Sequence, residues 1–406
     1  MLGAGGFLIV RAIGVLALNW APDRGGRPLT EVLKIWDGGW YVRIAEDGYA
    51  DHLDLSAPEI DQITGSLAFF PVYPMLMRAV SELTGLESQW AGALISLAAG
   101  AVAAAGVAIL ASDWAGDRVG VLAALLWAAA PMGVVAAMVY TEALFTALVV
   151  WTFVALRRHS WLLVGALGVA AGLTRPTGIA LGTAVAAYAV WIWWQARASG
   201  SREPDSVPAS DSDSVPVSDS VSDSVSVSDS VSDSVSQGAV PLFAAGLALA
   251  GTPAFWLWVA VRSGRWDGWF AVQSAFWGSR FDGGASLLTL AANLVRGSGA
   301  PGIGMMALAT LLCLLAGVGL LVLAVRSRVW WPLLVYAAIS LVMVIGSAGY
   351  FSSKLRFLVP MFVLAFPLAR WLAGRSRPIQ VIAIVGAVVA TTISGTWLLL
   401  SWPYAI

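Results

Sequence analysis

The chain has 406 residues, of which 59% are hydrophobic and 12% charged, with a formal net charge of −1 at pH 7. Its mean hydropathy is +0.79, and many separate apolar runs have the length of a membrane span, which a soluble core does not supply. Lys and Arg stand singly or in short clusters beside apolar runs, which excludes a nucleic-acid partner. One cysteine and two histidines exclude a disulfide framework and a thiolate or histidine-rich metal site.

The apolar runs predict about eleven transmembrane helices and therefore an all-α integral membrane fold. The first run carries Arg11 inside it and lacks a basic leading region, so we interpret it as a retained helix and not as a signal peptide. Several runs are short and rich in Gly and Ala, which favours close packing in a bundle. The predicted spans lie at residues 1–19, 90–111, 119–137, 140–156, 160–173, 177–195, 239–261, 302–325, 329–347, 356–373 and 379–400.

Two long segments separate the spans. Residues 21–89 form a mostly polar first loop, in which two prolines precede the run MLMRAVSELTGL; we expect a surface or re-entrant helix there. Residues 201–237 repeat Ser, Asp and Val, which bury too little apolar surface to offset chain entropy. We predict that they are a disordered cytoplasmic linker between an N-terminal part, 1–200, and a C-terminal part, 238–406, of one bundle.

Basic residues predict the orientation of the chain. They fall between spans on one alternating side, at Arg157, Arg158, Arg197, Arg202, Arg326, Arg328, Arg375 and Arg377. Assigning that side to the cytoplasm places the N-terminus inside and the C-terminus outside. The polar, motif-like segments then share the outer side: the first loop, residues 140–142, 174–178, 262–300 and 349–356.

The strongest candidate for chemistry is Asp37, in the stretch WDGGWYVRIAEDGY. In helical register Trp36 and Trp40 share a face, and Asp37 and Tyr41 lie four residues apart. A carboxylate beside flat aromatic surfaces, just outside a bilayer, suits a general base that acts on a sugar. The alternative is an amphipathic interfacial segment with its aromatic side chains at headgroup level.

Glu142 and Arg175 are candidates at the outer ends of spans. Glu142 follows Tyr140, and an acid in the first turn of a helix either caps the helix dipole or has a catalytic or acceptor-binding role. Arg175 precedes Pro176 on the side that the positive-inside rule disfavours. It therefore either snorkels to lipid headgroups or takes part in a site.

Two later segments place cations on the outer side. The loop RSGRWDGWFAVQSAFWGSRFDGG contains Gln273, Arg280 and Asp282 among aromatic residues, which suits a phosphate with a lipid tail or else an aromatic belt. Lys354 and Arg356 stand where a helix begins, which is unfavourable unless an anionic ligand compensates. We therefore predict substrate-binding roles for these five residues.

Several common catalytic motifs are absent from the sequence. There is no P-loop, no GxGxxG after a strand, no HExxH and no plausible Ser–His–acid arrangement. No DxD pair occurs in the outer segments. The sequence thus predicts neither a soluble nucleotide donor nor a metal or other cofactor.

Four runs in this order, WDGGWYVRIAEDGY, FFPVYPMLMR, YTEALF and LTRPTG, resemble the PIG-V family of mannosyltransferases. The actinobacterial membrane homologues look closest, and GSRFDGG and SKLRFLVP resemble later motifs of the family. The resemblance spans most of the chain except the Ser/Asp tract. It implies a GT-C-type multi-helix bundle whose first extracytoplasmic loop carries the catalytic acid.

The resemblance also implies an activity. Such enzymes transfer mannose from a polyprenyl-phosphate carrier to a glycan, glycolipid or protein acceptor at the outer face of the cytoplasmic membrane. Asp37 would deprotonate the acceptor hydroxyl in an inverting displacement. Cations would neutralise the phosphate, namely Arg280, Lys354 and Arg356, with Arg175 as a further candidate.

Two other classes remain open from the sequence. A transporter or flippase of lipid-linked sugars should carry ionisable residues at the membrane midplane and paired broken helices in two repeated halves. Here the charges cluster at one face and no internal repeat is evident. A non-catalytic protein that binds sugar lipids would retain the aromatic residues but would not need Asp37.

Overall fold

The computed structural model describes residues 2–21, 27–55, 63–200, 227–297 and 301–402. Within these ranges the chain is helical, with one isolated β-bridge between Phe281 and Ser347. The α-helices are α1 (Leu2–Trp20), α2 (Leu29–Leu33), α3 (Asp37–Asp47), α4 (Val72–Thr84), α5 (Ser88–Ala115), α6 (Asp117–Ala128), α7 (Glu142–Arg157), α8 (Trp161–Gly172), α9 (Gly178–Gly200), α10 (Val227–Ser263), α11 (Gly268–Trp277), α12 (Ala285–Val295), α13 (Pro301–Arg326), α14 (Trp331–Gly346), α15 (Ala365–Ala373) and α16 (Arg377–Ser401). The 3-10 helices are η1 (Ile63–Ala68), η2 (Gly133–Ala137), η3 (Phe351–Lys354), η4 (Arg356–Leu358) and η5 (Phe362–Leu364).

The predicted membrane bundle is confirmed, but the count of eleven spans is not. Within the described residues six helices are long and apolar enough to cross a membrane, namely α1, α5, α9, α10, α13 and α16. A pair bent by 73°, from Phe351–Leu358 to Phe362–Ala373, makes up to seven. The predicted spans 119–137 and 160–173 overlap α6 and α8, each of 12 residues, which is well short of the ~20 that a bilayer requires.

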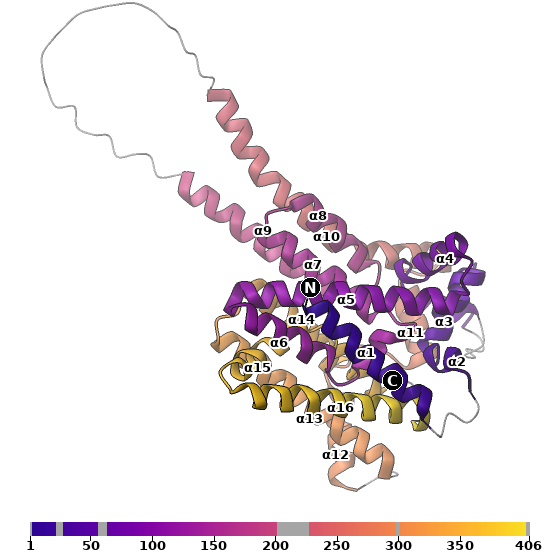
Figure 1. The fold of residues 1–406 in the computed structure, drawn as a ribbon. Helices are drawn as coiled ribbons and strands as arrows, with labels where there is room; N and C mark the ends of the chain where they lie inside the picture. The colour runs from indigo at the N-terminus through magenta and orange to yellow at the C-terminus, as the bar shows by residue number, and fades with distance from the viewer. Residues whose placement is uncertain (1, 22–26, 56–62, 201–226, 298–300, 403–406) are drawn as a thin grey trace, which may run out of the picture.

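Small residues bring α8 and α10 into close contact. A side-chain carbon added to Gly168 would lie 2.5 Å from Cβ of Ala248, and one added to Gly251 would lie 2.4 Å from the carbonyl oxygen of Val169. Glycines on facing helices therefore let the two backbones approach, as in other membrane bundles. Figure 1 shows α9 and α10 extending beyond the rest of the bundle.

The predicted linker is described only in part. Residues 201–226 lie outside the described residues, whereas 227–237 form the first turns of α10. The division of the chain into two parts about a cytoplasmic linker stays a prediction.

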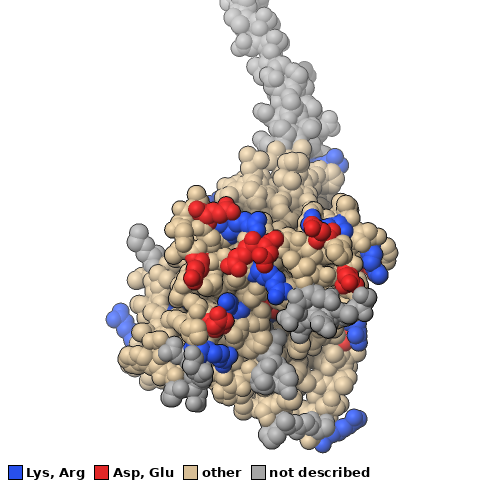
Figure 2. Space-filling model, turned by 90° about the vertical axis from the view of Figure 1, so that its right-hand side faces the viewer, with Lys and Arg blue, Asp and Glu red and all other residues tan. Residues whose placement is uncertain are grey.

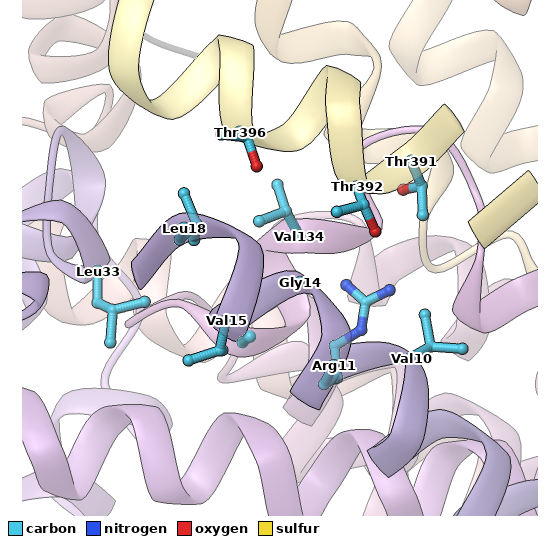
Figure 3. Close-up of a pocket in the computed structure, with 11 residues that line it drawn as sticks. Val10, Arg11, Gly14, Val15, Leu18, Leu33, Val134, Thr391, Thr392 and Thr396 are labelled. Atoms are coloured by element: carbon cyan, nitrogen blue, oxygen red, sulfur yellow. The ribbon is translucent and has the colours of Figure 1, made fainter. Parts of the chain in front are cut away.

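A buried arginine stabilises a break in the bundle between α6 and η2. The side chain of Arg11, in the middle of α1, is 5% exposed and donates to the backbone carbonyls of Ala128 and Gly133. These carbonyls flank the break, where helical partners are lost. The guanidinium points toward Thr391 and Thr392 of α16 (Figure 3). The chain that leaves η2 leads directly into the segment 139–142 at one end of the bundle.

The helices of the first loop gather at one end of the molecule. In Figure 1, α2, α3, α4 and α11 lie at the right, whereas α6 and α15 extend to the left. α4 begins after Pro71 and carries Pro74 in its first turn, where proline is tolerated because those N–H groups have no helical partner. The end formed by α3 and α11 holds the candidate site.

Candidate functional site

A cavity of about 350 Å³ opens at this end of the bundle, within the size range of small-molecule sites. Its polar lining combines an acid, a phenol and several cations, namely Asp37, Tyr41, Arg175, Arg280, Lys354 and Arg356. Many of the other lining residues are aromatic, namely Phe69, Phe70, Trp256, Trp269, Phe270, Trp277, Phe281, Tyr350 and Phe357. Figure 2 shows acidic and basic side chains gathered on this face of the molecule.

Asp37 occupies the first turn of α3, where the positive end of the helix dipole favours a carboxylate. The residue before it, Trp36, has a φ of 55°, an uncommon conformation for a residue with a side chain. This turn of the backbone at Trp36 separates α2 from α3, which begins at Asp37. A Cβ at Gly38 would lie 3.2 Å from the carbonyl oxygen of Val139, so glycine lets α3 pack closely beside the segment that leads to α7.

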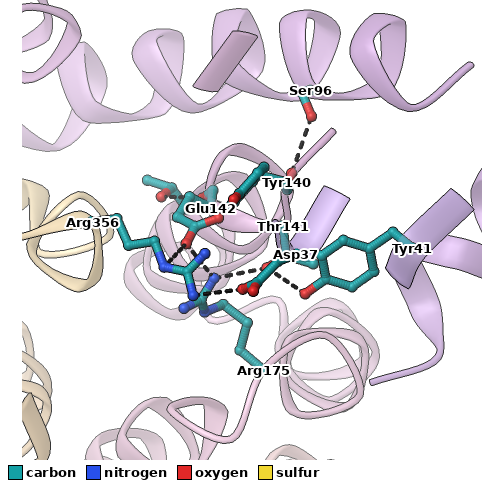
Figure 4. Close-up of polar contacts among 9 residues, drawn as sticks. Asp37, Tyr41, Ser96, Tyr140, Thr141, Glu142, Arg175 and Arg356 are labelled. Atoms are coloured by element: carbon teal, nitrogen blue, oxygen red, sulfur yellow. Dashed lines mark hydrogen bonds and ion pairs between the residues drawn. The ribbon is translucent and has the colours of Figure 1, made fainter. Parts of the chain in front are cut away.

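Two acids and two arginines alternate at the cavity wall (Figure 4). The Arg356 Nη2 atom lies 2.5 Å from Oδ2 of Asp37, and its Nε atom lies 3.7 Å from Oε1 of Glu142. The Arg175 Nη1 atom lies 2.7 Å from the same Glu142 oxygen. The side chain of Asp37 is 18% exposed and that of Glu142 is fully buried. Asp37 therefore reaches the cavity, whereas Glu142 lies behind the two guanidinium groups.

Hydroxyl groups and rings hold this cluster in place. Arg175 Nη1 donates to Oγ1 of Thr141 at 2.7 Å, and the Tyr41 hydroxyl lies 3.4 Å from the same oxygen. The guanidinium groups of Arg175 and Arg356 lie 5.2 and 5.1 Å from the centre of the Phe357 ring, which is within cation–π range. Burial, with a further contribution from the Asp37 charge, raises the pKa of the Tyr41 phenol, so this hydroxyl remains a hydrogen-bond donor at neutral pH.

The other two predicted cations, Lys354 and Arg280, also line the cavity but lie in different environments. Lys354 is buried, and its ammonium donates to the carbonyl oxygens of Val344, at 2.7 Å, and of Ser347. It thereby satisfies carbonyls at the end of α14. Arg280 is exposed at the cavity. Gln273 lines the cavity and donates to the carbonyl oxygen of Ala68 at 3.4 Å.

Four of the predicted site residues do not line the cavity, and one of them is Glu142, which lies behind the guanidinium groups. Trp40 is 8% exposed, stacks on Phe69 with ring centres 5.6 Å apart, and belongs to the core. Trp36 is not on a helical face with Trp40, because α3 begins only at Asp37; it packs against the main core. Asp282 accepts from the backbone N–H groups of Gly284 and Ser286, at 2.9 and 2.8 Å, and so caps α12.

Thr141 and most of the aromatic lining were not predicted from the sequence. Thr141 stands between two residues of the YTE segment, and its position beside Glu142 was the available signal. The aromatic residues of 262–284 divide in the structure: Trp269 lines the cavity, whereas Trp266 is 89% exposed, as expected of an interfacial belt.

The arrangement can bind a neutral polar ring and an anionic group side by side. A carboxylate and aromatic faces suit a sugar, and guanidinium groups suit a phosphate. Among the described residues no group of three or more His, Cys, Asp or Glu side chains is placed to hold a metal ion.

Comparison with known proteins gives one family match. The family model described as dolichyl-phosphate-mannose-protein mannosyltransferase matches residues 69–201, about a third of the chain. This match, on a helical membrane bundle, supports a membrane glycosyltransferase of the GT-C type. No curated protein and no solved structure matches the chain. The matched residues include Glu142 and Arg175 but neither Asp37 nor Arg356. The more specific resemblance to the PIG-V family is not confirmed by this match and stays a prediction.

Proposed function

We propose that the protein transfers mannose from a polyprenyl-phosphate carrier to an acceptor hydroxyl, with inversion at the anomeric carbon and with Asp37 as general base. The observation that carries this proposal is the position of the Asp37 carboxylate at a cavity that also presents cations and aromatic faces. The acceptor is a glycan, glycolipid or protein. The resemblance to PIG-V proteins supports the choice of mannose and of the lipid carrier.

The reaction needs one base and no acid. The acceptor oxygen forms a bond to C1 of the sugar while the bond from C1 to the phosphate oxygen breaks, and the acceptor proton passes to Asp37. Polyprenyl phosphate leaves as an anion and needs no proton. Arg175, Arg280 and Arg356 supply charge-assisted donors to that phosphate. The ammonium of Lys354, fixed on the α14 carbonyls, adds positive charge to the lining of the same cavity.

The apolar lining suits the lipid part of the donor. Trp256, Trp269 and Phe270 from α10 and α11 form one wall, while Met343 and Phe357 lie on the C-terminal part of the chain. A prenyl chain that starts from the cations would pass along these side chains toward the bilayer. We place this end of the bundle at the outer face of the cytoplasmic membrane, because the arginine-rich turns between the spans would then lie inside.

Transfer of radiolabelled mannose from polyprenyl-phosphate-mannose to membrane acceptors tests the proposal. Asp37→Asn keeps the shape of the side chain but removes the base, and we expect it to lower the transfer rate by roughly 10²- to 10⁴-fold. The matched control is Asp47→Asn at the exposed far end of the same helix, which should transfer like the wild type.

Each outcome separates a different part of the proposal. Equal transfer by Asp37→Asn and the wild type, at equal abundance in the membrane, would mean that another group is the base. Absence of mannose transfer by every form would contradict the proposed donor, and a lipid-flipping assay would then test the transporter alternative.

A further inference from the structure

Arg356 is shared unequally between two carboxylates. It contacts Asp37 at 2.5 Å but Glu142 only at 3.7 Å. The longer contact is not a hydrogen bond, and the Arg356 Nε atom is buried without a hydrogen-bond partner. The same Glu142 oxygen lies 2.7 Å from Arg175 Nη1. The guanidinium of Arg356 thus has a tight partner at the cavity and, behind it, a second carboxylate that it contacts only loosely.

In this arrangement Asp37 cannot act freely as the base while its carboxylate is bound to Arg356. Asp37 must offer a lone pair to the acceptor proton, yet one of its oxygens is bound by the guanidinium that faces the same cavity. An ionised carboxylate only accepts hydrogen bonds, and each bound donor occupies part of that capacity. The phosphodiester of the lipid donor, with two free oxygens that share a negative charge, is a strong competitor for a planar guanidinium.

We infer that the phosphate of the lipid donor and the carboxylate of Asp37 compete for Arg356, and that Glu142 is the positioning residue that keeps the guanidinium at the cavity when it leaves Asp37. This inference rests on the proposed function. Glu142 is itself held at 2.7 Å by Arg175, so its carboxylate stays in place while Arg356 changes partner.

Because Arg356 changes partner when the donor binds, the availability of Asp37 as a base depends on the donor. Without a donor, Asp37 is engaged by Arg356 and poorly placed to take a proton. When the phosphate binds, Arg356 turns to it, retains Glu142 as its second partner, and releases the Asp37 carboxylate beside the sugar. The base is therefore available only when the group to be transferred is present.

Binding of farnesyl phosphate to the purified full-length protein tests the competition, because a short prenyl phosphate reports on the phosphate site without turnover. Asp37→Asn removes the competing charge and frees Arg356 for the phosphate. We therefore expect this variant to bind farnesyl phosphate roughly fivefold more tightly than the wild type. Farnesol, which lacks the phosphate, should bind both forms equally.

A matched control distinguishes competition for Arg356 from a general effect of removing one negative charge near the cavity. Asp282→Asn also removes one negative charge near the cavity but keeps an oxygen to cap α12, and it should leave farnesyl phosphate affinity near that of the wild type. Arg356→Gln should weaken binding, and the double variant Asp37→Asn with Arg356→Gln should bind no more tightly than Arg356→Gln alone.

The role of Glu142 is tested in the same assay. Adding Glu142→Gln to Asp37→Asn should abolish the gain in farnesyl phosphate affinity while farnesol affinity is unchanged, which a loss of folding alone would not produce. If this double variant binds as tightly as Asp37→Asn, Glu142 does not position the arginine.

Failure of the inference and failure of the proposed function give different results. If the wild type binds farnesyl phosphate but Asp37→Asn gains no more than Asp282→Asn, the competition is wrong and the proposed function stands. If no form distinguishes farnesyl phosphate from farnesol, the lipid-phosphate donor itself is wrong.

Discussion

Asp37 and Glu142 are chemically similar acids that burial assigns to different tasks. Both contact Arg356, but only Asp37 lines the cavity. A fully buried carboxylate that contacts two guanidinium groups serves mainly to fix those cations, because an unpaired buried charge is costly. The distances from the two acids to the arginines do not by themselves distinguish these roles. The difference in burial between the two side chains does.

Replacement of Glu142 by Gln should destabilise the protein. The change leaves the buried Arg356 and the partly buried Arg175 with one negative charge fewer, and removing one partner of a buried ion pair typically costs about 3 kcal/mol or more. Thermal unfolding in detergent measures the loss. Glu82→Gln, on an exposed position of α4, is the control and should change stability by less than about 0.5 kcal/mol; equal midpoints for the two variants would contradict the role of Glu142.

Single residues were predictable where spacing alone decides the geometry. Asp37 and Tyr41, four apart, do lie in one helix and share the cavity. Trp36 was misplaced because its φ of 55° ends the helical register just before Asp37, and no side-chain pattern signals that conformation. Trp40 was expected to face a substrate, but its ring fills the space over Gly65, where an added Cβ would lie 2.4 Å from the indole.

At the scale of elements, the start of α12 depends on an acid that lies three residues before the helix begins. Asp282 accepts the N–H groups of Ser286 and Gly284, and these hydrogen bonds hold its pKa below the ordinary value of 3.8. Because the pKa of Asp282 is lowered in the folded state, its hydrogen bonds stabilise the start of α12 fully at pH values above 3.8. This stabilisation is lost as the pH falls through the lowered pKa.

Acid should therefore loosen the start of α12 in the wild type. Amide hydrogen exchange at Gly284 and Ser286, corrected for the intrinsic rates, should lose protection below about pH 4. Asp282→Asn keeps a neutral oxygen acceptor at every pH and should show no such acid-dependent loss. The same pH profile in both proteins would mean that ionisation of Asp282 does not matter to the cap.

The apolar runs located most of the long helices but not the breaks between them. Every predicted span from 90–111 onward overlaps a helix of the structure. The run 119–137 nevertheless breaks after α6, where Met132 adopts a φ of 61° and Arg11 satisfies the freed carbonyls. The partner that permits this break lies more than a hundred residues away in the sequence, so hydrophobicity within the run cannot reveal it.

At the scale of the whole molecule, segments far apart in the chain meet at one end. The Asp37, Glu142, Arg175 and Arg356 side chains come from four separate elements or loops and form one cluster. The alternation of spans predicted that these segments share a side of the membrane. It could not predict which of them touch, because that depends on how the helices tilt and pack.

Orientation in the membrane is a prediction that labelling can check. In a Cys313→Ser background, a cysteine at exposed Asp47 of α3 should react with a membrane-impermeant maleimide added to intact cells. A cysteine at exposed Ser376, beside the arginines before α16, should react only after the cells are opened. The reverse pattern would place the cavity on the cytoplasmic side.

The buried Arg11 has a consequence for how the protein is made. An arginine at the centre of a membrane helix costs roughly 2.5 to 3.5 kcal/mol during insertion, and its carbonyl partners lie 117 and 122 residues further along the chain. When α1 leaves the ribosome, those partners have not yet been synthesised. The first helix therefore carries this cost until α6 and η2 arrive. The hydrogen bonds of the first span thus depend on the part of the chain that leads to Glu142.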